Sequence, residues 1–308
     1  MVLLGILWWV VLGSWWTQAQ EWIYFSRSDD LVRMGPSGGP VQTLLRDVGI
    51  NPTLSPDGRY VVVEQIVERN GRGDWDLFLI DLVSRGVVPL VQEAGDDISP
   101  SWSPDGSWIV FASNRAGNYD LYRVRRDGGE LVRITFEPQH EEDPDWSPTG
   151  QGIVFREGGD LAWIREDGTG RRRLTADPFA DRQPAWSPDG RRVAFVSVGR
   201  QEAGTAGIFV LDFLSGAIRR VTRVALPGSD GHPSWSPDGN WIVFDRLLLD
   251  DLFADVEIFR VPANGGPPQN LTESLELEFH PFWFGPRGLR PTIPAGQPTT
   301  WGRVKVLP

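Results

Sequence analysis

The residues most able to do chemistry recur at two fixed positions before a proline. Directly before the proline stand Asn51, Ser99, Asp143, Gln183, His232 and His280. Three residues before it stand Gly49, Asp97, Glu141, Asp181, Asp230 and Glu278. Alternate residues of an extended chain point the same way, so both sets are expected to face one surface. Carboxylates and imidazoles gathered there would bind a cation, a basic peptide or the cationic part of a ligand.

From these two sets the predicted binding residues are Asp97, Glu141, Asp143, Asp181, Gln183, Asp230, His232, Glu278 and His280. An alternative interpretation is that the polar groups only accept hydrogen bonds from loop backbone in a solvated funnel. A third is a metal site, because His232 and His280 could share a metal with Asp143 or Gln183. We predict no bound cofactor, although the set is compatible with a divalent cation. His140 is out of register and is interpreted as a loop residue.

A repeat positions these residues. The stretch SWSPDGSWIVFAS at 101–113 returns as TLSPDGRYVVVE, DWSPTGQGIVFR, AWSPDGRRVAFV and SWSPDGNWIVFD, and the prolines of its turn lie 40 to 49 residues apart. A degenerate sixth copy, HPFWFGPRG, begins at His280. A unit of four strands with this period is typical of a β-propeller blade.

The copy at 100–135 shows the order of strands within a unit. Strand A ends in Trp-Ser at 102–103, strand B follows at 108–113, strand C at 120–124 and strand D at 131–135. In the Ser-Pro-Asp-Gly turn, proline presets φ to about −65°, Asp bonds its own backbone and Gly takes the left-handed conformation. The segments before each strand A and the B–C loops are expected to surround the mouth of a central channel.

Strand A occurs six times, but strands B, C and D follow it only five times. The missing set is at the start of the chain, in residues 22–45. The predicted fold is therefore all-β, a six-bladed β-propeller of four-stranded antiparallel blades. It is closed by pairing the C-terminal strand A near 281–284 with the N-terminal strands B–C–D, which removes open sheet edges. The predicted domain covers 20–286, between a signal peptide at 1–19 and a Pro-rich tail at 287–308.

Aromatic and charged residues of the repeat have structural interpretations. The last strand-A positions hold Trp102, Trp146, Trp186, Trp235 and Trp283, with leucine in the remaining blade. They are expected to pack one blade on the next, and a carbohydrate platform is the alternative. The pairs Arg27/Asp30, Arg115/Asp120 and Arg156/Asp160 are expected to form ion pairs that hold the B–C hairpins.

Two B–C loops are enlarged, at 199–207 and 245–257. The second contains four leucines and a phenylalanine. Helical spacing predicts a turn or two of amphipathic helix on the propeller rim, and a partner-docking surface is the alternative, since exposed apolar clusters usually mark interfaces.

Composition excludes several classes of function. The net charge of −11 argues against nucleic-acid binding, which needs a basic surface. The absence of cysteine excludes disulfides, zinc–thiolate sites and cysteine nucleophiles. No G-x-S-x-G elbow and no nucleophile–base pair is visible, so catalysis is not predicted.

The N-terminus indicates export. Residues 2–16 are apolar, and TQA at 17–19 offers small residues for cleavage. This length fits a signal-peptide core better than a membrane span; an uncleaved anchor and a buried strand are the alternatives. The predicted location is periplasmic or secreted, in a bacterium, with membrane contact only through this segment. The protein is expected to be a monomer.

The segment from Pro100 to Thr135 resembles the WD40-like PD40 repeat of TolB-type six-bladed propellers. The resemblance covers nearly all of the chain after the N-terminal segment. TolB carries an α/β domain before its propeller, and this sequence has no room for one, so we expect a lone propeller. The resemblance implies a fold, and the same propeller serves many roles.

The predicted function is an extracytoplasmic TolB-like propeller that acts as a non-catalytic protein-interaction or ligand-binding module. It would bind a protein or peptide partner, a basic one by charge, through the acidic loop face at the channel mouth. The alternative is a metal-dependent lyase or hydrolase on a polysaccharide, related to oligogalacturonate lyase-like propellers, which hold a metal with His and Gln. A uronate-binding site would want arginine and lysine, and the acidic rings argue against it. A structural or sensor part of an envelope complex is a further hypothesis.

Overall fold

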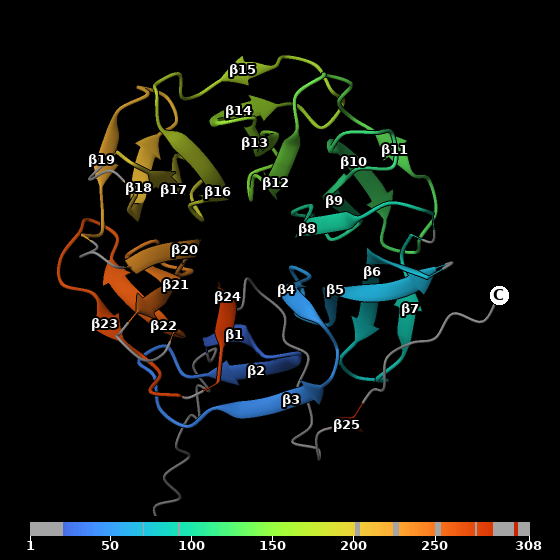
Figure 1. The fold of residues 1–308 in the computed structure, drawn as a ribbon, viewed down its shortest axis with the longest axis horizontal. Helices are drawn as coiled ribbons and strands as arrows, with labels where there is room; N and C mark the ends of the chain where they lie inside the picture. Colours follow the sequence, from blue (N-terminus) through green and yellow to red (C-terminus); the bar gives the residue numbers. More distant parts are fainter. Residues whose placement is uncertain are drawn as a thin grey trace, which may run out of the picture.

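The computed structural model describes residues 21–285, apart from 70, 92, 201–203, 224–227, 250–253 and 275, together with residues 299–300. The predicted signal peptide lies outside the described residues, and so does the predicted tail except for 299–300. The described segments form strands arranged as wedge-shaped sheets around a centre (Figure 1). In these segments no helix is long and apolar enough to cross a membrane.

Six blades follow one another around the ring (Figure 1). The first three are blade 1, with β4 (Ile50–Leu54), β5 (Tyr60–Arg69), β6 (Arg72–Asp81) and β7 (Val87–Pro89); blade 2, with β8 (Asp97–Trp102), β9 (Trp108–Ser113), β10 (Asp120–Arg125) and β11 (Val132–Arg133); and blade 3, with β12 (Glu141–Trp146), β13 (Ile153–Glu157), β14 (Asp160–Ile164) and β15 (Arg172–Arg173).

The last three are blade 4, with β16 (Ala180–Trp186), β17 (Arg192–Val198), β18 (Ala206–Asp212) and β19 (Ile218–Arg220); blade 5, with β20 (Gly228–Trp235), β21 (Trp241–Leu249), β22 (Ala254–Pro262) and β23 (Gln269–Asn270); and blade 6, with β24 (Glu278–Phe284), β1 (Trp22–Arg27), β2 (Asp30–Met34) and β3 (Gln42–Arg46). β25 (Thr299–Thr300) pairs parallel with β3. The sheets of blades 4 and 5 are joined by one parallel pair, Ala206 with Ser229.

Blade 6 closes the ring as predicted. β24, from the end of the described propeller, pairs antiparallel with β1, from its start, so that Ile23 lies opposite Trp283 (Figure 1). The predicted N-terminal strands B, C and D correspond to β1, β2 and β3. The closure holds the two ends of the ring together through backbone hydrogen bonds, and β24 covers the inner edge of β1.

The Ser-Pro-Asp-Gly turn forms for the reasons its residues suggest. In blade 2 the Gly106 N–H donates to the Ser103 carbonyl over 2.9 Å, and Gly106 has a φ of +68°. The Asp105 carboxylate accepts the Ser103 hydroxyl at 2.5 Å and the Ser107 N–H at 3.0 Å, while the Ser103 hydroxyl accepts the Trp108 N–H at 2.9 Å. Four hydrogen bonds therefore set the angle between strands A and B.

We expect Asp105→Ala to lower the free energy of unfolding by about 1 kcal/mol, because a turn carboxylate with hydroxyl and amide donors behaves like a helix cap. Urea unfolding at neutral pH measures the difference. The matched control is Asp127→Ala, whose carboxylate accepts one amide, that of Gly129, and it should have a smaller effect. Equal effects of the two substitutions would contradict the proposed role of the Ser103 hydroxyl.

A bulge interrupts the innermost strand of every blade. In blade 2 the β8–β9 register shifts between Ile98 and Ser101, across Ser99 and Pro100. Proline has no N–H to give to the ladder, which is why it occurs at bulges. The residue before the proline has a φ of 45° to 55° in all six blades, at Asn51, Ser99, Asp143, Gln183, His232 and His280. The left-handed residue turns its side chain out of the regular alternation of the strand.

The blade-to-blade packing of the tryptophans is confirmed. The five strand-A tryptophans are 4–8% exposed. Trp102 packs in a cluster with Val62 and Leu77 of blade 1 and Ile109 of its own blade. Its indole N–H also donates to the Thr53 carbonyl of blade 1 over 3.1 Å. Trp102 therefore contributes both buried area and a polar contact to the neighbouring blade.

The helix expected at 245–257 is wrong. Residues 245–249 continue β21 and residues 254–257 begin β22, in register from Trp241↔Pro262 to Leu249↔Ala254. Cross-strand backbone pairing satisfies the hydrogen-bonding groups that a helix would have satisfied. At 199–207, β18 begins at Ala206, and residues 201–203 lie outside the described part of the chain.

Candidate functional site

A central channel of about 510 Å³ is lined by the first strands of all six blades. We call the residues before the prolines the first ring and the residues after them the second ring. The first ring is Asn51, Ser99, Asp143, Gln183, His232 and His280. The second ring is Thr53, Ser101, Asp145, Ala185, Ser234 and Phe282.

The five carboxylates three residues before each proline do not line this channel. Their residues are only 0–1% exposed, and each one pairs with an arginine. The pairs are Asp97–Arg115, Glu141–Arg171, Asp181–Arg200, Asp230–Arg246 and Glu278–Arg27. The sequence-based expectation that these side chains converge on the mouth is wrong. The bulge between them and the first ring breaks the strand alternation on which it depended.

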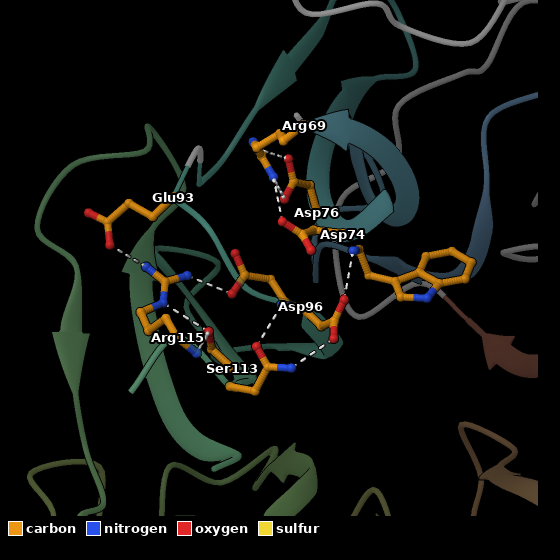
Figure 2. Close-up of polar contacts among 10 residues, drawn as sticks. Arg69, Asp74, Asp76, Glu93, Asp96, Ser113 and Arg115 are labelled. Atoms are coloured by element: carbon orange, nitrogen blue, oxygen red, sulfur yellow. Dashed lines mark hydrogen bonds and ion pairs between the residues drawn. The ribbon is translucent and has the colours of Figure 1, made fainter. Parts of the chain in front are cut away.

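Arg115 illustrates how these carboxylates are held. Its guanidinium donates to the Asp97 carboxylate over 2.5 Å, to the Ser113 hydroxyl over 2.8 Å and to Glu93 over 3.0 Å. Figure 2 shows Arg115 between Glu93 and Ser113, beside the separate cluster of Arg69 with two aspartates. Arg115 also lies 5.0 Å from the ring centroid of Tyr122. Burial raises the pKa of Asp97 to about 6, although the arginine acts in the opposite direction.

The prediction of ion pairs within the B–C hairpins is wrong, because each of these arginines and aspartates pairs with another residue. Arg27 and Arg115 pair with the buried carboxylates described above, and Arg156 pairs with Glu142 over 2.8 Å. The hairpin aspartates pair instead with arginines of the outer strands or of the segment that follows them: Asp30 with Arg46, Asp120 with Arg133, Asp160 with Arg173. These pairs connect successive strands of a blade, so their role is structural.

Two carboxylates that the sequence reasoning missed lie beside the first ring. Glu64 of β5 and Asp245 of β21 are 5% and 6% exposed. The Glu64 carboxylate accepts the Asn51 side-chain amide at 2.7 Å and the Ser99 N–H at 2.6 Å. Burial raises the pKa of Glu64 to about 7. An acidic residue within an otherwise apolar strand B, where blade 2 has Ala112, is the signal that could have identified them.

Asp143 and Asp145 of β12 bring two further carboxylates to the channel, one to each ring. Asp143 accepts the Gln183 N–H at 3.1 Å and the Ser99 hydroxyl at 3.3 Å. Asp145 accepts the Ser101 hydroxyl at 3.0 Å and the Trp186 N–H at 2.7 Å. Burial raises the pKa of Asp145 to about 6.

These carboxylates alternate around the ring. Glu64, Asp143 and Asp245 come from blades 1, 3 and 5, and each accepts the backbone N–H of the first-ring residue in the next blade. Those donors are Ser99 at 2.6 Å, Gln183 at 3.1 Å and His280 at 3.0 Å. The bulge takes these N–H groups out of the strand ladder, and a buried donor without an acceptor is costly. The acids therefore have a structural function as well as a charge.

The two histidines meet in the same ring. The His232 and His280 ring centroids lie 4.0 Å apart with the planes at 74°. His232 Nδ1 is 2.7 Å from the Asp245 carboxylate, and its Nε2 is 2.6 Å from the Gln183 amide. Asp245 can approach closely because residue 231 is glycine; a Cβ there would lie 2.5 Å from its Oδ1.

Burial opposes the positive charge of His232, but the charge and hydrogen bond of Asp245 raise its pKa overall. The pKa of His280 shifts in the opposite direction, because burial and the charge of His232 lower it to about 3. The two imidazoles therefore carry one positive charge at most near neutral pH. Burial opposes the negative charge of Asp245, while His232 lowers the pKa of Asp245 overall.

The first ring does not present a ready set of metal ligands. Both ring nitrogens of His232 have partners, while His280 Nδ1 is buried without one. Across the described segments, no group of three or more His, Asp or Glu side chains is placed to hold a metal ion. His232 and His280 therefore have no third His, Asp or Glu placed to complete a metal site with them in the described segments.

The His232–Asp245 ion pair predicts that the stability lost with Asp245→Asn depends on pH. The raised pKa of His232 contributes stability below pH 6.5 that is lost as the pH rises through its folded value, and the lowered pKa of Asp245 contributes stability above pH 3.8. The substitution should therefore cost most stability near pH 5 and less at pH 9. Urea unfolding at both values measures this. A loss independent of pH would show that the ion pair contributes nothing beyond its hydrogen bonds; Glu130→Gln, on an exposed turn, is the control.

The channel acids differ from the buried carboxylates in one respect. Among the described residues, no charged arginine or lysine nitrogen lies within 4.0 Å of the carboxylates of Glu64, Asp143 and Asp145. By contrast, the five carboxylates three residues before the prolines each have an arginine at 2.5–2.9 Å. The channel therefore carries an excess of negative charge. Among the described ion pairs, the one cation of the first ring is His232, which pairs with Asp245.

Comparison with known proteins agrees with this architecture. Residues 41–175 match the family model described as PD40, the TolB β-propeller domain. TolB from Acinetobacter baumannii superposes with a TM-score of 0.71 and 20% identity, over 86% of this chain and 66% of that one. The chain thus spans just under two thirds of that TolB.

Other propellers superpose less closely. An oligogalacturonate lyase in complex with manganese gives a TM-score of 0.56 with 18% identity, over 82% of this chain and 74% of that one. Hydrazine synthase from Kuenenia stuttgartiensis gives 0.66 with 11% identity, over 89% and 48%. These likenesses establish the fold. The repeats, the closed ring and these likenesses together show that the chain is a β-propeller, of which residues 41–175 match the PD40 family model.

Proposed function

We propose that this propeller is an extracytoplasmic, non-catalytic binding module that takes a cationic part of a protein or peptide partner into its channel. The observation that carries the proposal is a group of carboxylates at the channel that have no arginine partner. Asp143 and Asp145 line the 510 Å³ cavity. Glu64 lies behind two lining residues and accepts hydrogen bonds from both, Asn51 and Ser99. A buried carboxylate normally obtains a partner or becomes protonated. A lysine or arginine side chain, or an amino terminus, would supply the missing charge.

The net charge of −11 supports the same proposal, because an acidic molecule attracts basic partners over long range. Similarity to TolB supports a role in protein interaction and a location outside the cytoplasm. The apolar N-terminal sequence supports export, to the periplasm or beyond. We retain the domain limits 20–286 and a monomeric state as parts of the proposal.

The test is affinity capture with the full chain from a bacterial envelope extract, followed by binding of the identified partner to two purified variants. One carries Asp143→Asn and Asp145→Asn, which remove charge and keep most of the shape. The control carries Asp167→Asn and Glu130→Gln on exposed turns. We expect the channel variant to bind at least about tenfold more weakly, the equivalent of one charge-assisted contact. A partner that binds both variants equally would place the binding surface elsewhere.

A second candidate function is a lyase that acts on acidic polysaccharide. It is favoured by the likeness to an oligogalacturonate lyase in complex with manganese and by Gln183, His232 and His280 lying together in the first ring. Incubation with oligogalacturonate and manganese, followed by the ultraviolet absorbance of unsaturated products, tests it. Stoichiometric metal in the purified chain that is lost with His232→Ala or His280→Ala would favour this function. The acids of the channel argue against it, because they repel uronate carboxylates.

A further inference from the structure

We propose that binding of a cationic group in the channel is linked to release of a proton, and that the carboxyl of Glu64 releases it. The proposal rests on the proposed function and adds a control by pH to it. Three features carry it: Glu64 is buried beside the first ring, its two hydrogen bonds come from uncharged donors, and both residues that donate them, Asn51 and Ser99, line the cavity.

The contacts of Glu64 do not supply a positive charge. Its Oε1 accepts both N–H groups, from the side chain of Asn51 on β4 and the backbone of Ser99 on β8. The charged groups that act on it from other elements are Asp143 of β12, which disfavours ionisation, and His232 of β20, which favours it. His232 is already held by Asp245 at 2.7 Å, so its charge is shared with a nearer carboxylate.

The buried carboxylates of the same molecule show what Glu64 lacks. Asp97 in the adjacent blade is as inaccessible as Glu64 but has the Arg115 guanidinium at 2.5 Å. Both carboxyls are buried, and only one has a permanent cation. Burial raises the pKa of Glu64 to about 7. At neutral pH the free protein therefore holds Glu64 in a mixture of protonated and ionised forms.

An ammonium or guanidinium group in the cavity would provide the missing charge and favour the ionised form. The two events are then one equilibrium, in which the ligand enters and the proton leaves. Only the ionised fraction offers the charge, so the apparent affinity scales with that fraction. For a carboxyl that titrates near pH 7, affinity should be about tenfold lower at pH 6 than at pH 8.

The probe is a lysine dipeptide, acetylated and amidated, titrated by calorimetry into the full chain at pH 6, 7 and 8. Each titration is done in two buffers of different ionisation enthalpy, which counts the protons released. We expect proton release at pH 6 and 7 and almost none at pH 8. Glu64→Gln, which keeps an acceptor oxygen, should bind at every pH no more tightly than the unchanged protein does at pH 6, and should lose most of the proton release at pH 7. Glu130→Gln is the control, expected to behave like the unchanged protein.

Carbon-13 spectra of the glutamate carboxyls, with Glu64→Gln to assign the signal, give a second readout. The Glu64 signal should titrate near pH 7 in the free chain and at lower pH with the peptide bound. Peptide binding with the same affinity at all three pH values, or a Glu64 signal that titrates near pH 4.5, would overturn the proton linkage and leave the proposed function standing. A lack of peptide binding at every pH would refute the cationic-ligand function itself, and the linkage with it.

Discussion

Replacing Arg115 with methionine should lower the free energy of unfolding by about 3–5 kcal/mol near pH 8, because it leaves the Asp97 carboxylate buried without a counter-charge. Asp97 is 0% exposed, and Arg115 gives it a hydrogen bond of 2.5 Å. The same guanidinium holds the Ser113 hydroxyl and covers the ring of Tyr122. Its loss therefore removes both charge and packing between strands A, B and C of blade 2. Urea unfolding measures the change.

The penalty should depend on pH with a definite sign. Burial already raises the pKa of Asp97 to about 6 with the arginine present, and removing the arginine raises it further. The folded variant then binds a proton more tightly than its unfolded chain, so its stability falls as the pH rises above about 4. At pH 5 the lone carboxyl is neutral and the loss should be smaller.

Two further variants separate charge from packing. Asp97→Asn combined with Arg115→Met removes both charges and should recover much of the stability, because an unpaired buried charge costs more than a missing pair. Arg125→Met breaks an exposed pair with Glu130 and should have no measurable effect. A loss for Arg115→Met alone that is no larger than for Arg125→Met would contradict the structural role given to the buried carboxylates.

Glu64→Gln should have the opposite effect and stabilise the fold at pH 8. A pKa of about 7, against 4.5 for an ordinary glutamate, means that the folded protein binds the proton more tightly than the unfolded chain. The unfolding free energy therefore falls as the pH rises from about 4.5 to about 7 and does not fall further above it. Glutamine avoids this cost, so the variant should gain about 3 kcal/mol above pH 7.

The gain should disappear below pH 4.5, where the carboxyl is protonated in both states. Denaturant unfolding of both proteins at pH 4.5 and 8 measures the difference. Glu64→Ala is the informative companion: it also removes the charge but leaves the Ser99 N–H without its acceptor, so it should destabilise the fold. An equal stability of Glu64→Gln and the unchanged protein at pH 8 would show that the carboxylate has a source of positive charge in the folded protein.

These two residues illustrate a division within the fold. Asp97 and Glu64 are both buried acids in neighbouring blades, and the sequence singled out Asp97 for the channel. In the structure Asp97 stabilises its blade together with Arg115, and Glu64 faces the first ring. A stabilising acid has its own cation, whereas the acids of the proposed site lack one, and proteins commonly accept such a cost in stability at functional sites.

Much of the fold could be predicted because its signals are local and repeated. The turn at Ser103–Gly106 is specified by four adjacent residues, and it recurs with the blade period. The N-terminal strands match the missing strands of the last blade, which predicts the pairing of β24 with β1. The extended β21–β22 hairpin was not predicted, because short apolar runs fit helix and strand equally well and cross-strand pairing decides between them.

For the candidate site, the sequence identified the ring positions but misplaced their neighbours. Counting back from the proline found all six first-ring residues, including Asp143 and His232, which do line the channel. Counting back two further residues assumed an unbroken strand. The proline itself was the signal for a bulge, and the interpretation did not use it.

By itself, then, the amino-acid sequence determined the blade repeat, the order of strands, the closure and the identity of the first ring, since each depends on residues close together in the chain or on a regular period. Only the tertiary structure decided which acids are neutralised. That choice depends on a left-handed residue before each proline and on arginines 16 to 30 residues away in sequence or, for Glu278 and Arg27, at opposite ends of the chain. Burial depends on the packing of neighbouring blades, and the pairing of each acid depends on how the strands of its blade are folded.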